Sequence, residues 1–184
     1  MLTNKYNNSR SNLILVAVFT AINIIILATG SYTYFLFSAS IPYILTDTAM
    51  FLCGMYPEEF YTEEYQGMEF LDSSFFVISL IISAVIVAVY LLCYFLSKNK
   101  VGWLVFSLVF FIVDTVGMFY MYGISTDMII DFIFHAWVIV SLCMGINAHS
   151  KLAKLPPEEW QPQTYAPTES EPRDNGSDMN SENS

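Results

Sequence analysis

Four long apolar runs alternate with polar segments along the chain, and they predict helices at about residues 13–35, 75–96, 101–122 and 126–149. Each run has about 20 residues or more, which at 1.5 Å rise per residue is enough to cross about 30 Å of hydrocarbon. Because lipid offers no hydrogen bonds to an exposed backbone, apolar segments of this kind are expected to be helical. The pattern therefore predicts an all-α fold, an integral membrane four-helix bundle.

All the basic residues fall on one side of this four-run pattern. Positive charge marks the cytoplasmic side of short membrane loops, so both the N and C termini are predicted to be cytoplasmic. Neither the connection between the first and second runs nor the one between the third and fourth contains a basic residue. The seven basic residues are Lys5, Arg10, Lys98, Lys100, Lys151, Lys154 and Arg173.

The first run has an alternative interpretation as a cleaved signal peptide, because Lys5 and Arg10 precede it. Its apolar core is long, and apolar residues continue through 32–37, which favours a helix that is retained in the mature protein. Localisation in a plasma membrane is expected. Richness in Asn and Ile points weakly to a bacterial inner membrane.

The polar segments predict three further regions. Residues 1–12 are expected to be a frayed cytoplasmic end, and residues 150–184 a cytoplasmic, acidic and disordered tail. The outer loop at 38–74 contains an apolar stretch at 41–55 that is too short to span, so an interfacial or re-entrant helix is expected there. Residues 57–66 start with Pro and acids, which favours a second short helix.

Composition excludes several classes of function. Acidic residues outnumber basic ones 17 to 7, so no basic patch could neutralise the phosphates of a nucleic acid. A CxxC pair, a P-loop, GxGxxG, HExxH and GxSxG are all absent from the sequence. The chain is therefore not expected to be an enzyme or to bind a cofactor.

Three ionisable residues lie inside the predicted spans, and such residues are costly unless they face the bundle and find partners. Asp131 and His135 are four apart, on one face of the last helix, and Asp114 is expected at matching depth on the preceding helix. We therefore predict an intramembrane polar cluster of Asp114, Asp131 and His135. It could be a structural clamp, or a proton relay or cation site; no metal site is expected, because no ligand motif is present.

Other side chains are candidates for helix packing. Asn23 is the strongly polar residue in the middle of the first predicted helix, and a polar helix–helix contact is its expected role. Small residues four apart mark packing seams, which could serve self-association or the internal fold. These pairs are Ala17 with Ala21, Ala84 with Ala88, and Ser141 with Gly145.

Two families resemble this layout in outline. Four helices with a long first outer loop resemble claudin-type proteins, but this loop has Cys53 alone and no Trp-Gly-Leu-Trp motif. Small multidrug transporters are similar in helix count but place a Glu in the first helix, where this chain has Asn23. Neither resemblance carries a function across.

Two functional hypotheses remain from the sequence. The first is a non-enzymatic accessory or interaction component of a membrane complex, with the lipid bilayer, protein partners or a second copy of the chain as its contacts. Acidic disordered tails often serve as interaction segments, which favours this hypothesis. The alternative is a small proton- or cation-coupled transporter or channel subunit that uses the Asp/His cluster.

Overall fold

A computed structural model describes residues 1–31, 38–62, 65, 67–123 and 129–155. Within these ranges all the regular secondary structure is helical, which confirms the predicted all-α class. Four helices are long and apolar enough to cross a membrane: α1, α3, α4 and α5. The elements are α1 (Leu2–Ala28), α2 (Ser40–Leu52), a 3₁₀ turn η1 (Glu58–Phe60), α3 (Ser74–Leu96), α4 (Gly102–Tyr122) and α5 (Ile129–Leu152).

The bounds of α1 differ from the predicted range 13–35 at both ends. The helix starts at Leu2, and the segment expected to be frayed is helical because Tyr6 and Ser9 are buried against other helices. It ends at Ala28 because Gly30 has a positive φ of 78°. The Ser31 N–H returns to the Ile26 carbonyl, and this pattern satisfies the last carbonyls of a helix. Residues 32–35 lie outside the described residues.

The other three long helices lie close to the predicted ranges. Helices α3 and α4 each start within one residue of the expected position and end where expected, at Leu96 and Tyr122. Helix α5 continues to Leu152, three residues beyond the predicted 149. The predicted start of this helix at 126–128 and the predicted disordered tail from 156 onward lie outside the described residues.

The long helices bury several polar side chains and expose many large apolar ones. On α3 the buried residues are Ser79, Ser83, Tyr90 and Cys93. A protein in water would not leave so many large apolar side chains exposed, so the outer surface suits a hydrocarbon environment. On α3, α4 and α5 the exposed side chains include Val77, Ile78, Ile81, Val85, Leu92, Phe95, Val109, Val113, Val116, Ile129, Ile130, Ile133 and Val140.

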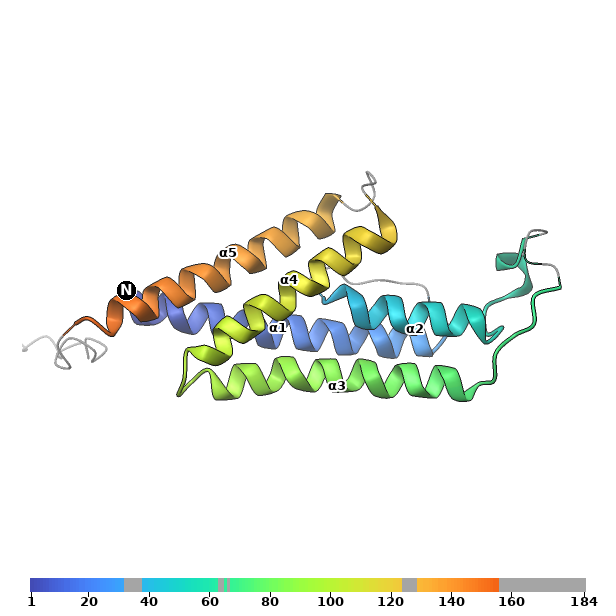
Figure 1. The fold of residues 1–184 in the computed structure, drawn as a ribbon, viewed down its shortest axis with the longest axis horizontal. Coiled ribbons are helices and arrows are strands. Elements are labelled where there is room, and N and C mark those ends of the chain that lie inside the picture. Colours follow the sequence, from blue (N-terminus) through green and yellow to red (C-terminus); the bar gives the residue numbers. More distant parts are fainter. Residues whose placement is uncertain (32–37, 63–64, 66, 124–128, 156–184) are drawn as a thin grey trace, which may run out of the picture. The chain divides into compact units, whose positions relative to one another are not determined.

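Helix α1 organises the bundle because it packs against α5, α3 and α2 (Figure 1). Helix α5 lies along the first part of α1, and α2 lies along the second part, where it also packs against α3. The hydrophobic core runs between these helices. Its largest fully buried side chains include Leu13, Leu27, Tyr90, Leu104, Phe111, Met118 and Leu142.

Helix α2 falls within residues 41–55, where an interfacial or re-entrant helix was predicted, apart from one extra residue at its start. It ends at Leu52, followed by Gly54 at a φ of 69°, where the Phe70 ring packs so closely that a Cβ would meet it at 2.8 Å. Of the second short helix predicted at 57–66, the structure describes the 3₁₀ turn η1 and a 3₁₀ position at Tyr65, while residues 63, 64 and 66 lie outside the described residues.

Candidate functional site

Seven polar side chains gather in the interior of the bundle, and we call them the polar cluster. They come from α1, from the residues at the start of α2, from α4 and from α5. All except the half-buried Thr115 are buried. The members are Thr20, Asn23, Ser38, Ser40, Asp114, Thr115 and His135.

The polar cluster is built around the N-terminus of α2, which begins inside the bundle. Ser38 and Ala39 lie beside Asn23 and Thr20 of α1: Asn23 donates to the Ser38 hydroxyl at 2.8 Å, and Thr20 accepts from the Ala39 N–H at 2.8 Å. Thr20 is eight residues before Ala28, the last residue of α1. The chain therefore returns into the bundle before α2 begins.

Asp114 of α4 accepts both of the next two backbone N–H groups. Its Oδ2 accepts from Ser40 at 2.9 Å and its Oδ1 from Ile41 at 2.8 Å. The first four N–H groups of any α-helix have no acceptor within the helix. Counted from the N-cap Ala39, the fourth position is Pro42, which has no N–H and is tolerated in a first turn. Every N–H group at this buried helix start is therefore accounted for by Thr20, by Asp114 or by proline.

Electrostatics favour the same arrangement. The N-terminus of a helix has a partial positive charge from its aligned peptide dipoles, and a carboxylate there is stabilising. Asp114 is only 2% exposed. A buried carboxylate needs hydrogen bonds and a compensating charge, and the first turn of α2 supplies both.

His135 connects α5 to the cluster through both ring nitrogens. Nδ1 lies 2.9 Å from the Thr115 hydroxyl, and that hydroxyl donates to the Phe111 carbonyl at 2.8 Å. Nε2 lies 3.3 Å from the Ser40 hydroxyl, which donates to Met118 Sδ at 3.2 Å. The ring also stacks on Phe111, with centroids 4.8 Å apart. Each ring nitrogen therefore lies within hydrogen-bond distance of a hydroxyl group.

The three residues predicted to form one cluster are placed as follows. Asp114 and His135 come together, with Oδ2 and Nδ1 4.0 Å apart. Asp131 is 8% exposed and lies one turn along α5, but no hydrogen bond or ion pair joins it to either residue in the described part of the chain. Asn23 contacts Ser38, in the segment that leads into α2.

A second set of contacts fixes the other end of α1. Arg10 donates to the Tyr94 carbonyl and to the Ser97 hydroxyl, each at 3.0 Å, at the C-terminus of α3. Tyr6 donates to the Ser97 carbonyl. A cation at a helix C-terminus complements the partial negative charge of its last carbonyls.

The predicted packing seams differ in how deeply they are buried. A Cβ at Gly145 would overlap the side chain of Ser9, so this glycine permits α1 to approach α5 closely. Ala17 is fully buried. Ala84 and Ala88, by contrast, are exposed on α3.

A recess lies between α2 and the η1 segment, with a volume of about 530 Å³; we call it the outer recess. Tyr56 donates to the Asp47 carboxylate, and its ring centroid is 5.2 Å from Phe60 and 6.3 Å from Phe51. Aromatic faces beside a carboxylate suit a cation. The lining residues are Asp47, Thr48, Phe51, Tyr56 and Phe60.

No group of three His, Cys, Asp or Glu side chains in the described residues is arranged to hold a metal ion. Cys53, Cys93 and Cys143 are all free thiols.

Sequence reasoning found Asp114, His135 and Asn23, but it did not identify Thr20, Ser38, Ser40 or Thr115. Single hydroxyl residues are common in apolar helices, so their types carry no signal of their own. The acid-and-aromatic composition of residues 47–60 was a signal for the outer recess.

No protein-family model, curated protein or solved structure matches this chain.

Proposed function

We propose that this chain is an integral membrane protein of a plasma membrane that spans the bilayer four times, with both termini in the cytoplasm. The exposed apolar faces of α3, α4 and α5 and the four helices of sufficient length support insertion. The distribution of Lys and Arg supports the orientation. In this arrangement α2 is a re-entrant helix, and its N-terminus lies at membrane depth, where only protein groups can satisfy the backbone.

Within that membrane, the protein acts as a non-enzymatic accessory or interaction component of a complex. The observation that carries this proposal is that the polar atoms of Asp114 and His135 are used by the fold itself. Both oxygens of Asp114 are taken by backbone N–H groups, and both nitrogens of His135 face hydroxyl groups. The interior therefore supports a fixed scaffold, and function is assigned to the surfaces.

The outer recess is the proposed contact surface for a basic partner. No Lys or Arg occurs between residues 38 and 74, while this stretch has seven acids. A partner's Lys or Arg side chain could lie against Phe51 and Phe60 with its charge near Asp47, and such contacts gain about 0.5–2 kcal/mol from the aromatic faces alone.

In-membrane cross-linking of the full chain in its native cells tests this surface. Asp47→Asn and Phe60→Ala should reduce the yield of a cross-linked partner several-fold, because they remove the charge and one aromatic wall. Asp72→Asn is the matched control, since it removes an acid from the same loop outside the recess. Equal yields from all three variants and the parent would refute the proposed surface. Deleting residues 156–184 separately tests the tail.

A second candidate function is proton- or cation-coupled transport. The approach of Asp114 to His135 at 4.0 Å, beside the start of a re-entrant helix, favours it. Flux into liposomes containing the purified protein discriminates the two. The scaffold is supported if the parent protein carries no proton or cation flux and if Asp114→Asn and His135→Gln lower its thermal stability. Flux that these variants abolish while stability is retained supports transport.

A further inference from the structure

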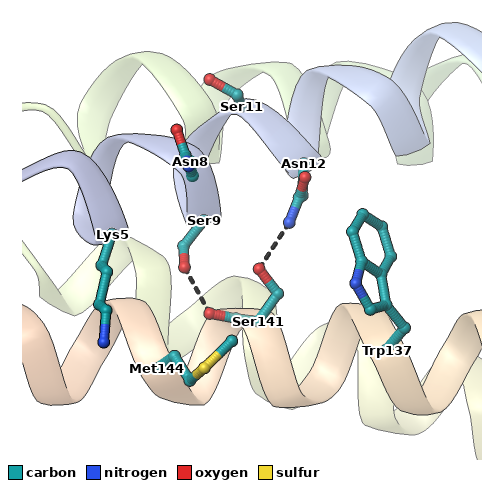
Figure 2. Close-up of a pocket in the computed structure, with 8 residues that line it drawn as sticks. All are labelled: Lys5, Asn8, Ser9, Ser11, Asn12, Trp137, Ser141 and Met144. Atoms are coloured by element: carbon teal, nitrogen blue, oxygen red, sulfur yellow. Dashed lines mark hydrogen bonds between the residues drawn. The ribbon is translucent and has the colours of Figure 1, made fainter.

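A groove of about 410 Å³ lies between α1 and α5, away from both the polar cluster and the outer recess. Figure 2 shows the two helices side by side, with Lys5 at one end of the groove and Trp137 at the other. Ser9 and Asn12 bond to Ser141 across its floor. The lining residues are Lys5, Asn8, Ser9, Ser11 and Asn12 of α1 and Trp137, Ser141 and Met144 of α5.

The α1 side of this groove is polar and incompletely satisfied. Lys5, Asn8 and Ser11 are exposed, and none of their side chains makes a hydrogen bond or ion pair within the described part of the chain. Among the described residues that line the groove there is one cation, Lys5, and no carboxylate. The groove therefore carries a net positive charge next to amide and hydroxyl donors, a combination that suits a phosphate ester.

The α5 side continues the groove with apolar residues. A second hollow of about 300 Å³ is lined by Ile130, Ile133, Phe134 and Trp137, so Trp137 belongs to both. From Met144 to Ile130 is 14 residues of one helix, about 21 Å at helical rise. One face of α5 thus runs from a polar end to a fully apolar end over the length of an acyl chain.

The position of the groove in the bundle agrees with this change from a polar end to an apolar end. Tyr6, adjacent to Lys5, bonds to Ser97 at the end of α3, where the chain turns through Lys98 and Lys100. Asn12 is six residues further along α1, about 9 Å deeper. The polar end of the groove therefore lies at the positively charged border of the bundle, and its apolar end lies inside the span.

We propose that this groove binds one acidic glycerophospholipid, with its phosphate at Lys5 and Asn8 and an acyl chain along Trp137 toward Ile133. This inference rests on the proposed membrane insertion but not on the outer recess. The gradient from cation to apolar surface favours an intact lipid, because a free phosphate ion would leave the α5 surface uncovered.

Lipid titration of the delipidated full-length protein in detergent tests the inference, with intrinsic tryptophan emission and thermal unfolding as the two readouts. Phosphatidylglycerol should bind more tightly than phosphatidylcholine, and glycerol phosphate should produce no shift. Lys5→Gln should weaken the binding of phosphatidylglycerol about fivefold and leave the binding of phosphatidylcholine unchanged, as expected for one lysine near an anionic lipid. Trp137→Ala should weaken the binding of both lipids.

Lys98→Gln is the matched control, because Lys98 is an exposed lysine at the same border but outside the groove. Lys5 is exposed and has no side-chain bond in the described residues, so Lys5→Gln should unfold at the same temperature as the parent when no lipid is added. Equal losses from Lys5→Gln and Lys98→Gln, or an equal shift with glycerol phosphate, would overturn the lipid site. Protein that stays monodisperse without detergent would refute membrane insertion, on which the lipid site rests. A change in cross-linking at Asp47 would test the outer recess and would not affect the lipid site.

Discussion

Two aspartates accept hydrogen bonds from the first N–H groups of helices, one in the interior and one at the surface. Asp114 comes from α4 and accepts from Ser40 and Ile41 at the start of α2. Asp72 precedes α3 and accepts from Ser74, the first residue of that helix, at 2.8 Å. The bond lengths are nearly the same, but Asp114 is buried and Asp72 is exposed.

The comparison shows that the surroundings, rather than the bond, determine what a cap contributes. Water can replace Asp72 as an acceptor at the exposed start of α3, so the net contribution of Asp72 to stability is small. No water is available to replace Asp114 at a helix start within the bundle, and each N–H left without an acceptor there carries its full desolvation cost. The buried cap should therefore decide whether α2 stays inside.

Removing the buried cap should have the largest effect. Asp114→Leu leaves the Ser40 and Ile41 N–H groups without acceptors, which should cost about 2–6 kcal/mol, at about 1–3 per buried donor. Asp114→Asn keeps one acceptor oxygen and should lose less stability than Asp114→Leu. Denaturation in mixed micelles measures both, with Asp131→Asn as the control carboxylate. A loss for Asp131→Asn as large as that for Asp114→Leu would contradict the cap.

Removing the neighbouring acceptor, Thr20, should cause the next largest loss of stability. Thr20→Val removes the hydroxyl that accepts from Ala39 but keeps the volume, so we expect a loss of about 1–3 kcal/mol. Thr20→Ser should recover most of it because the hydroxyl returns. The same denaturation measurement applies, and identical stability for the Val and Ser variants would show that the hydroxyl is unimportant.

The close approach of α2 to α4 can be tested at Gly117, one turn after Asp114. A Cβ there would lie 3.1 Å from the Ile41 side chain. Gly117→Val should therefore cost about 1–3 kcal/mol by overpacking, and Ile41→Ala in the same chain should restore part of it. Strict additivity of the two substitutions would mean that the contact does not position α2.

The exposed cap should give the smallest effect, and one that depends on pH. The Ser74 hydroxyl and then its backbone N–H lower the pKa of Asp72 below its ordinary value of 3.8. Because the folded carboxyl has the lower pKa, the stability it adds is present above pH 3.8 and is lost as the pH falls through the folded value. The difference in melting temperature between the parent and Asp72→Ala should be small at pH 7 and absent at low pH. A difference that grows on acidification would contradict the assignment.

Some contacts could be anticipated from residue types and others could not. Asp114, His135 and Asn23 stand out because ionisable or amide side chains are rare in apolar helices and must find partners there. That the partner of Asp114 is a helix start rather than Asp131 could not be anticipated, because backbone N–H groups leave no mark in a sequence. The helix predicted at 13–35 runs through Gly30, whose positive φ ends α1, and only the packing of Tyr6 and Ser9 explains why the polar first turns of α1 are helical.

The chain by itself determined that four long helices form and, for α3 and α4, where they start and end to within one residue, because hydrophobic length acts over a few neighbouring positions. Tertiary structure alone decided where α2 starts, which side chains satisfy it, and that α1 and α5 leave an amphiphilic groove between them. Those outcomes depend on groups far apart in sequence, such as Asp114 and Ser40, that meet only when the helices pack.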